Sequence, residues 1–370
     1  MKSRWDYSII KKTALYIIRP VSPGKMKGEI FMKKFFGTMP SGEECFLYTI
    51  SCGRLTAVIT DCGAALVNLL VPDARGETAD VVLGYDTPEA YISSSAFLGS
   101  TVGRNANRVQ GASFPLNGKT YAMTPNENGN NLHSGPDCYK NRLWKVESHT
   151  ASAISLSLHS PHGDQGFPGN AEIRVTYSLD AEGGLHIVYD AVSDRDTVFN
   201  LTNHSYFNLA GHEKTDAAMN QLLTIPGRWF NPDDAENIPT GEQRSVAGTP
   251  MDFRTPKPIG RNIGMDYEPL KLQGGYDHNW EVFCNPCAIL EDPASGRSMA
   301  VYTDCPGIQF YSGNFLKDIG KSGIYYSKRS GIALETQFAP DSLHHPEWPQ
   351  PITKAGERYH SETVYRFGTV

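Results

Sequence analysis

The sequence lacks a long apolar run, and it lacks a strong excess of either charge. In 370 residues the formal net charge is only −6, and charged residues make up 20% of the chain. The apolar stretches at residues 7–10 and 14–18 are separated by Lys11-Lys12 and closed by Arg19-Pro20, so neither forms a signal core or a membrane span. Nothing in this composition favours nucleic acid or an anionic membrane as a partner, and we expect a small, uncharged molecule instead.

Cysteine is sparse and irregularly placed. The seven cysteines are odd in number and scattered over the chain, which argues against a disulfide framework and indicates a reducing, cytoplasmic location. Cys284 and Cys287 have the spacing of a redox or metal-binding pair. No second pair with this spacing occurs and no βαβ pattern surrounds them, so we interpret the spacing as incidental.

Three common functional motifs are missing. Gly320-Lys321-Ser322 resembles the end of a phosphate-binding loop, but Phe315 occupies the position of the required first glycine. No HExxH or G-x-S-x-G motif occurs, and the prolines near His344-His345 argue against a helical zinc site. The chain therefore lacks the signatures of nucleotide-binding proteins and of the commoner hydrolases.

Helical periodicity is rare, whereas alternating apolar and polar residues, which are typical of strands, recur along the chain. Residues 55–60 alternate in this way, and residues 173–179 and 185–189 alternate on either side of a turn, which predicts a hairpin. Thr87-Pro88 begins one short predicted helix. With 35 Gly and 24 Pro between the short segments, the pattern predicts an all-β sandwich with long loops and few short helices.

The first 34 residues differ in charge from the rest of the chain. They hold nine Lys or Arg and two acidic residues, so this leader carries +7 and the remainder −13. We predict that residues 1–34 are a basic, poorly ordered N-terminal extension, with Met26 and Met32 as alternative start sites. Neither a fixed-period repeat nor a low-complexity tract divides the remainder, so we predict a single domain over residues 35–370.

Two histidines lie in polar segments that suit proton transfer or ligand binding. His204 lies among amide and aromatic residues at positions 203–208, and an unperturbed histidine titrates near pH ~6.5. His133 follows Asn130-Asn131 in a predicted loop. Taken alone, each is more simply explained as a structural histidine with its hydrogen bonds satisfied.

Three charged residues complete the candidate set. Arg108 lies 25 residues before the loop histidine, and a predicted hairpin at residues 116–119 could bring the two to one cleft. Asp277 follows Gly274-Gly275, where a carboxylate could hold adjacent hydroxyls or form an Asx turn. Glu335 ends an apolar strand, so burial would raise its pKa toward that of a useful base unless a salt bridge compensates its charge.

Six motifs are similar in order and spacing to those of the aldose 1-epimerase, or galactose mutarotase, family. The similarity covers roughly residues 40 to 370, and Ser134 is a mild departure where the family usually has glycine. The resemblance implies a large antiparallel β-sandwich, of the galactose mutarotase-like supersandwich type, with the site in a cleft on one sheet. The motifs are Gly-Arg-Asn-Ala-Asn-Arg (103–108), Asn-Leu-His-Ser-Gly (131–135), Leu-Thr-Asn-His-Ser-Tyr-Phe-Asn-Leu (201–209), Tyr-Asp-His-Asn (276–279), Pro-Gly-Ile-Gln-Phe-Tyr-Ser-Gly-Asn-Phe (306–315) and Leu-Glu-Thr-Gln (334–337).

The resemblance also implies a reaction and a division of roles. The family interconverts the α and β anomers of free aldohexoses such as galactose and glucose, and requires neither a cofactor nor a metal. Glu335 would be the general base that removes the proton of the anomeric O1 hydroxyl, and His204 the general acid that protonates the ring oxygen. The sugar would be bound by Asn107, Arg108, His133, Asp277 and Gln309.

Gln309 and Phe310 are neighbours in a predicted strand. Because successive side chains point to opposite faces of a sheet, only one of the two can line a given cleft. We expect Gln309 to face the sugar, and we give Phe310 little weight as a stacking platform.

Alternative functions stay open at this level. The same scaffold could be a non-catalytic sugar-binding or sensing module, or it could act on hexose 6-phosphates or another aldose. Arg104 and Arg142 are the candidate phosphate ligands. The sequence does not specify the preferred sugar, or a monomer as opposed to a homodimer. A further alternative is a metal site built from His133, His204, Asp277 and Glu335.

Overall fold

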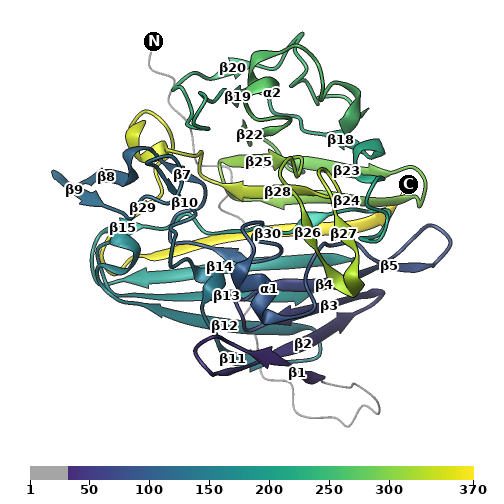
Figure 1. The fold of residues 1–370 in the computed structure, drawn as a ribbon, viewed down its shortest axis with the longest axis horizontal. Helices are drawn as coiled ribbons and strands as arrows, with labels where there is room; N and C mark the ends of the chain where they lie inside the picture. Colours follow the sequence, from purple (N-terminus) through teal and green to yellow (C-terminus); the bar gives the residue numbers. More distant parts are fainter. Residues whose placement is uncertain (1–31) are drawn as a thin grey trace. The chain divides into compact units, whose positions relative to one another are not determined.

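Antiparallel β-sheet makes up most of the computed structural model, which describes residues 32–370 (Figure 1). The predictions for residues 1–31 therefore lie outside the described residues, while residues 33 and 34 begin the first strand. The nine-stranded sheet follows the order β11-β12-β13-β14-β30-β24-β23-β18-β21. Its strands are β11 (Lys145–His149), β12 (Ala153–Ser160), β13 (Ala171–Leu179), β14 (Gly184–Ser193), β30 (Arg358–Thr369), β24 (Arg297–Thr303), β23 (Ala288–Asp292), β18 (Leu222–Thr224) and β21 (Lys257–Pro258).

A six-stranded sheet, in the upper part of Figure 1, carries several of the candidate site residues. Its order is β17-β28-β25-β22-β19-β20, and every pairing in it is antiparallel. The strands are β17 (Tyr206–Phe207), β28 (Ile332–Gln337), β25 (Gly307–Tyr311), β22 (Asp277–Glu281), β19 (Trp229–Asn231) and β20 (Arg244–Ser245).

A five-stranded sheet and several short ladders complete the strands. The five-stranded sheet contains β1 (Lys33–Thr38), β2 (Glu44–Cys52), β3 (Leu55–Thr60), β4 (Leu66–Pro72) and β5 (Thr78–Asp80) in sequence order. The two-stranded ladders pair β6 (Thr101–Val102) with β16 (Thr202–Asn203), β7 (Arg108–Val109) with β10 (Asn131–Leu132), β8 (Ser113–Leu116) with β9 (Lys119–Ala122), β15 (Thr197–Val198) with β29 (Ile352–Thr353), and β26 (Asp318–Ile319) with β27 (Tyr325–Tyr326).

The all-β prediction is confirmed, and so are its two hairpins, β13-β14 and β8-β9. Only two α-helices occur in residues 32–370. The predicted one is α1 (Pro88–Ser93), where Thr87 Oγ1 accepts a hydrogen bond from the Ala90 N–H. The other, α2 (Glu268–Leu272), was not predicted, because a helix of this length shows too few turns for a periodic pattern.

The main apolar core joins the nine-stranded sheet to one face of the six-stranded sheet. Burial alternates along β13 and β14, as their hydrophobic pattern predicted. Between the sheets, the rings of Phe207 and Tyr365 lie 4.9 Å apart, and the Tyr365 hydroxyl donates to the Leu334 carbonyl at 2.9 Å. Phe310 is fully buried in this core and stacks on Tyr276, so its ring does not face the opposite, polar side of the sheet.

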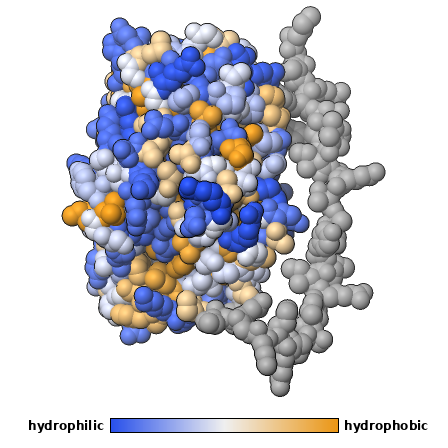
Figure 2. All heavy atoms as spheres, turned by 90° about the vertical axis from the view of Figure 1, so that its right-hand side faces the viewer, coloured by the Kyte–Doolittle hydropathy of each residue, from blue (hydrophilic) through white to orange (hydrophobic). Residues whose placement is uncertain are grey.

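The surface seen in Figure 2 is mainly hydrophilic, with apolar residues singly or in small groups. Large exposed apolar side chains are few within residues 32–370, and they include Phe315, Ile319 and Tyr325. In this part of the chain, no helix combines the length and apolar character needed to cross a membrane. All seven cysteines are free thiols, which agrees with the expectation that no disulfide framework is present.

Candidate active site

The polar face of the six-stranded sheet carries a row of side chains from four adjacent strands. Antiparallel pairing places Asn231 opposite Asn279. Asn279 lies in turn opposite Gln309, which lies opposite Glu335. Paired residues share one face of a sheet and neighbours along a strand alternate, so Gln309 and Glu335 point away from the core that holds Phe310. The pairing register therefore positions the candidate base.

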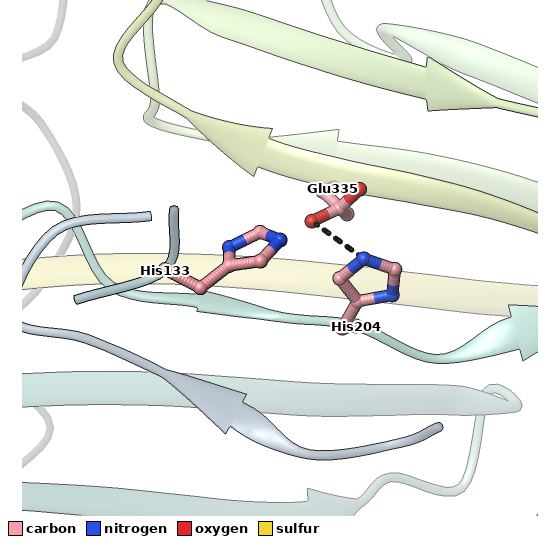
Figure 3. Close-up of side chains that lie close together, drawn as sticks. All are labelled: His133, His204 and Glu335. Carbon is pink, nitrogen blue, oxygen red and sulfur yellow. Dashed lines mark ion pairs between the residues drawn. The ribbon is translucent and has the colours of Figure 1, made fainter. Parts of the chain in front are cut away.

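Glu335 on β28 and His204, directly after β16, form a buried pair (Figure 3). The Nε2 atom of His204 lies 3.6 Å from Oε2 of Glu335, and the two side chains are 8% and 3% exposed. Burial raises the pKa of Glu335 well above its ordinary value; the charge of Asp277 adds to this effect and Arg108 opposes it. Burial lowers the pKa of His204 to about 4. Both shifts disfavour charge, so a proton shared by the pair resides preferentially on the carboxyl group.

His204 is fixed by backbone hydrogen bonds and by ring packing. Its N–H donates to the Ser100 carbonyl at 3.0 Å, and its carbonyl accepts from the Gly99 N–H at 2.9 Å. The imidazole stacks on Tyr206, with ring centroids 5.0 Å apart and planes inclined by 30°. Its Nδ1 atom is buried and makes no hydrogen bond with any of residues 32–370. The packing thus presents Nε2 to Glu335.

His133 turns its ring toward the same carboxyl group (Figure 3). Its Nδ1 atom accepts a hydrogen bond from the Asn107 N–H at 3.1 Å. Burial, together with nearby His204 and Arg108, lowers the pKa of His133 well below its ordinary value, so the ring is neutral. A neutral imidazole carries one hydrogen, which must then lie on Nε2. His133 therefore offers the site a hydrogen-bond donor.

His133, His204 and Glu335 also lie close enough together to raise the question of a metal. One potential ligand atom from each lies within 4.8 Å of the others. However, the Asn107 contact leaves the hydrogen of His133 on Nε2, and a protonated nitrogen has no lone pair for a metal. Asp277, the fourth residue of the metal alternative, does not belong to this cluster. The donor set fits proton transfer better than metal coordination.

Phe97 packs against both histidines. Its ring centroid lies 4.8 Å from that of His133 and 6.0 Å from that of His204. The φ angle of Phe97 is 56°, in the left-handed region that bulky residues rarely adopt. Such strain persists only where the surrounding structure enforces it, and it concentrates at functional sites. Phe97 thus belongs to the wall of the candidate site.

Arg108, the first residue of β7, is oriented by Glu127. The Nε and Nη2 groups donate to the two carboxylate oxygens at 2.5 and 3.2 Å, which leaves Nη1 without a hydrogen bond to any of residues 32–370. Burial disfavours the charge of Arg108, but Asp277, Glu127 and Asp233 outweigh burial and raise its pKa. Arg108 therefore stays charged and keeps one donor group available.

Asp277 and Gln309 contact each other on the same face of the sheet. Gln309 Nε2 donates to Asp277 Oδ1 at 2.7 Å. Burial raises the pKa of Asp277, while Arg108 and the Gln309 hydrogen bond oppose that shift. Asn107 uses its Oδ1 to accept the Arg108 N–H at 3.0 Å, and its Nδ2 group makes no hydrogen bond to the described residues. These groups retain hydrogen-bonding capacity for a polar ligand.

The predicted residues thus fall into two groups that Arg108 connects electrostatically. One group is His133, His204 and Glu335, and the other is Asp277 with Gln309. The charge of Arg108 acts on both Glu335 and Asp277. Two neighbours of these groups, Phe97 and Glu127, were missed by sequence reasoning. Neither stands in a recognisable pattern, because an aromatic residue or a glutamate in a loop has no distinctive local signature.

Arg104 and Arg142, the candidate phosphate ligands, serve the fold instead. Arg104 is fully buried and donates to backbone carbonyls, including Gly169 at 3.0 Å, and to the hydroxyl of Ser160 at 2.8 Å. Arg142 forms an ion pair with Asp164 at 2.7 Å. Both guanidinium groups are therefore engaged within the protein, and neither supports the recognition of a sugar phosphate.

Ser134, the departure from the usual motif, has a local explanation. Its φ is 58°, which is the region that favours glycine. Its hydroxyl accepts a hydrogen bond from the Asn105 N–H and donates one to the Asn105 carbonyl, both at 3.0 Å. These two bonds tie the His133 loop to the segment that precedes Arg108 and offset the unfavourable backbone conformation.

The fold and the buried pair of His204 and Glu335 are those of the galactose mutarotase-like β-sandwich class. The family model described as aldose 1-epimerase matches residues 47–366 of the chain. The chain belongs to the aldose 1-epimerase family.

Relatives from animals and bacteria are similar over nearly the whole chain. The galactose mutarotase of Bos taurus is 38% identical over 342 residues, which cover 90% of this chain and 97% of the relative. The aldose 1-epimerase of Escherichia coli strain K12 is 35% identical over 345 residues, which cover 89% of this chain and 96% of the relative.

Solved structures share the fold. The crystal structure of the GalM/aldose epimerase homologue from C. elegans matches with a TM-score of 0.81 at 32% identity, covering 88% of this chain and 99% of that chain. Galactose 1-epimerase from Lactobacillus acidophilus matches with a TM-score of 0.79 at 27% identity, covering 92% and 99%. The supersandwich expectation is therefore confirmed.

Proposed function

We propose that this chain is an aldose 1-epimerase that interconverts the α and β anomers of free aldohexoses such as galactose and glucose. Family membership supports the reaction class. The single observation that carries the proposal is the buried pair of His204 and Glu335, 3.6 Å apart, whose pKa values shift in opposite directions. An acid and a base that face one another suit a reaction that moves one proton off the substrate and another onto it.

In this mechanism Glu335 takes the proton of the anomeric O1 hydroxyl as the C1–ring oxygen bond breaks. His204 gives a proton from Nε2 to the ring oxygen, and the product is the open-chain aldehyde with its new hydroxyl group. Rotation about the C1–C2 bond exposes the other face of the aldehyde. Ring closure then reverses both transfers, with Glu335 as acid and His204 as base, and yields the opposite anomer.

The pair needs one proton in total throughout the cycle. Ring opening starts from the minor form of the pair, with the proton on His204, and it ends with the proton on Glu335, where burial favours it. Because an imidazolium with a carboxylate and an imidazole with a carboxylic acid have the same total charge, the site keeps a constant net charge during the reaction. A buried site benefits from this constancy, since any uncompensated charge would be costly there.

The remaining residues would position the sugar. His133 donates from Nε2, and Arg108 donates from the Nη1 group that Glu127 leaves free. Asp277 and Gln309 would bind further hydroxyls, as would the Nδ2 group of Asn107. The partner is thus an uncharged monosaccharide. We also propose a cytoplasmic location, which the seven free cysteines support.

Polarimetry tests this proposal. Freshly dissolved α-D-galactose and α-D-glucose should relax to their usual equilibrium rotations faster with the protein than without it. A panel of other free aldoses ranks the substrates in the same experiment. If no free aldose relaxes faster, the chain is not a mutarotase.

A further inference from the structure

Asp233 is a buried carboxyl group for which the fold provides no partner. It lies two residues after the end of β19, and it is 8% exposed. Its carboxyl group makes no hydrogen bond and no ion pair with any of residues 32–370. Polar groups buried to this degree are normally satisfied within the protein or by a ligand, because burial without a partner costs free energy. Asp233 therefore requires an explanation.

The neighbouring Asp234 shows what a structural role would look like. Its Oδ1 atom accepts the N–H groups of Glu236 and Ile238 at 2.8 and 3.1 Å, and these bonds close the turn after β19. Asp233 makes no comparable contact, so the turn does not depend on its side chain.

Asp233 lies just beyond the end of β19, at the end of the ladder where β22 carries Asp277. Asn231, the last residue of β19, pairs with Asn279 on β22. The ladder ends at this pair, and Asp233 follows Asn231 by two residues while Asp277 precedes Asn279 by two, so both lie beyond the same end of the ladder. The electrostatic neighbours agree. After burial, the charge of Asp277 is the main cause that raises the pKa of Asp233, and the charge of Arg108 opposes it.

We propose that Asp233 is a further substrate-binding residue, which pairs with Asp277 to bind a hydroxyl group of the aldose that does not take part in ring opening. This inference rests on the proposed function of the site. Because the pKa values of both carboxyl groups are raised, one of them can hold a proton while the other is ionised, and together they then offer both a donor and an acceptor. A sugar hydroxyl is also both donor and acceptor, so the pair matches its chemistry. Arg108 lies close enough to both groups to offset their remaining charge.

The test combines a protein variant with sugars that lack single hydroxyl groups. Asp233→Leu keeps the branched shape and removes both oxygens, and Asp234→Asn is the matched control from the same turn. Mutarotation is followed with D-galactose and its 2-, 3-, 4- and 6-deoxy derivatives. We expect Asp233→Leu to raise KM for galactose about tenfold with little change in kcat, because a contact made equally in ground and transition states is lost. The control should behave as the unchanged protein does.

The deoxy sugar that lacks the hydroxyl bound by Asp233 should be the one sugar for which the variant makes no difference. For that sugar, Asp233→Leu and the unchanged protein should agree in KM within about twofold, because no contact remains to be lost. If Asp233→Leu leaves KM within about twofold for galactose and for all four derivatives, Asp233 does not bind the substrate.

A crystal structure of Glu335→Gln with galactose gives an independent answer if Asp233→Leu does not fold. We expect an Asp233 carboxyl oxygen within about 3.2 Å of a sugar hydroxyl, and a separation above about 4 Å overturns the proposal. Absence of mutarotation in the unchanged protein contradicts the proposed function instead. The crystal structure then still decides the role of Asp233: galactose bound within hydrogen-bond distance of its carboxyl group supports the proposal, and a site without galactose overturns it.

Discussion

The Nε2 atom of His204 faces Oε2 of Glu335 across 3.6 Å, and both side chains are almost completely buried. This distance exceeds that of a hydrogen bond, so the two groups are close but not bonded to each other. Neither Nδ1 of His204 nor Oε2 of Glu335 has another hydrogen-bond partner among residues 32–370. The carboxyl oxygen that faces His204 thus has no hydrogen-bond partner within the described part of the chain.

Substitution of either member of the pair should remove most of the activity. We expect Glu335→Gln and His204→Asn each to lower kcat by about 10²- to 10⁴-fold, since each removes one positioned proton transfer. Mutarotation rates from polarimetry provide the measurement. Glu281→Gln and His159→Asn change the same residue types at more exposed positions and should retain full activity. Wild-type rates in either pair variant would refute the role assigned to it.

The pH dependence of kcat/KM should be bell-shaped, because the pair works only while it holds one proton. Below about pH 4, to which burial lowers the pKa of His204, the pair gains a second proton and Glu335 can no longer act as base. On the alkaline side, activity should fall as the pair loses its last proton. That limb should lie well above the ordinary pKa of a glutamate, since burial raises the pKa of Glu335.

The two limbs belong to the pair as a whole rather than to single residues. In Glu335→Gln the remaining activity should lose the alkaline limb that this carboxyl group causes. A profile for the unchanged protein that is flat between about pH 3 and 9 would contradict the one-proton requirement.

Replacement of Glu335, the proposed base, should stabilise the fold at neutral pH. The pKa of Glu335 is raised in the folded protein, so its favourable contribution is present below the unfolded value of about 4.3 and is lost as pH rises through the folded value. Glu335→Gln carries no such penalty. We expect its free energy of unfolding to exceed that of the unchanged protein by about 1 kcal/mol or more at pH 7, and to approach it near pH 4.

Denaturant unfolding at the two pH values measures this difference. Glu281→Gln is the matched control, because Glu281 is half-buried and accepts a hydrogen bond from Arg228. It should gain no stability at pH 7. The prediction is contradicted if the difference in unfolding free energy between Glu335→Gln and the unchanged protein is the same at both pH values. Ionisation of the buried carboxyl group would then not destabilise the fold.

Glu127 should act on the sugar through Arg108. Glu127→Gln replaces a bidentate, charge-assisted contact with a single neutral one, so the guanidinium group becomes less well oriented. We expect KM for galactose to rise about three- to tenfold with a smaller change in kcat. Arg108→Met should have a larger effect, and adding Glu127→Gln to it should cost little more. Glu147→Gln removes an exposed acid that pairs with Lys145 and should leave KM unchanged.

Parts of this structure could be predicted from the sequence because they depend on local pattern. The two hairpins follow from alternation and turn residues, and α1 follows from a threonine cap before a proline. The opposite orientation of Gln309 and Phe310 follows from their adjacency in a strand. The helix α2 was not predicted, since its single turn carries no periodicity.

Most of the site geometry could not be predicted, because it depends on pairing between distant segments. The sequence marked His204 and Glu335, but it did not indicate that their reactive atoms face each other. The tautomer of His133 depends on a backbone N–H of Asn107, which no side-chain pattern reveals. Phe97 and Glu127 likewise acquire their roles only from what the fold places beside them.

The row of paired residues that ends at Glu335 limits which insertions and deletions this sheet can accept during evolution. A one-residue slip of β28 against β25 would turn the glutamate into the apolar interior and remove its carboxyl group from the polar face. The connection from residue 312 to residue 331 lies outside the β25-β28 ladder, which sets that alignment. Insertions in this connection can therefore be accommodated while the position of Glu335 opposite Gln309 is kept.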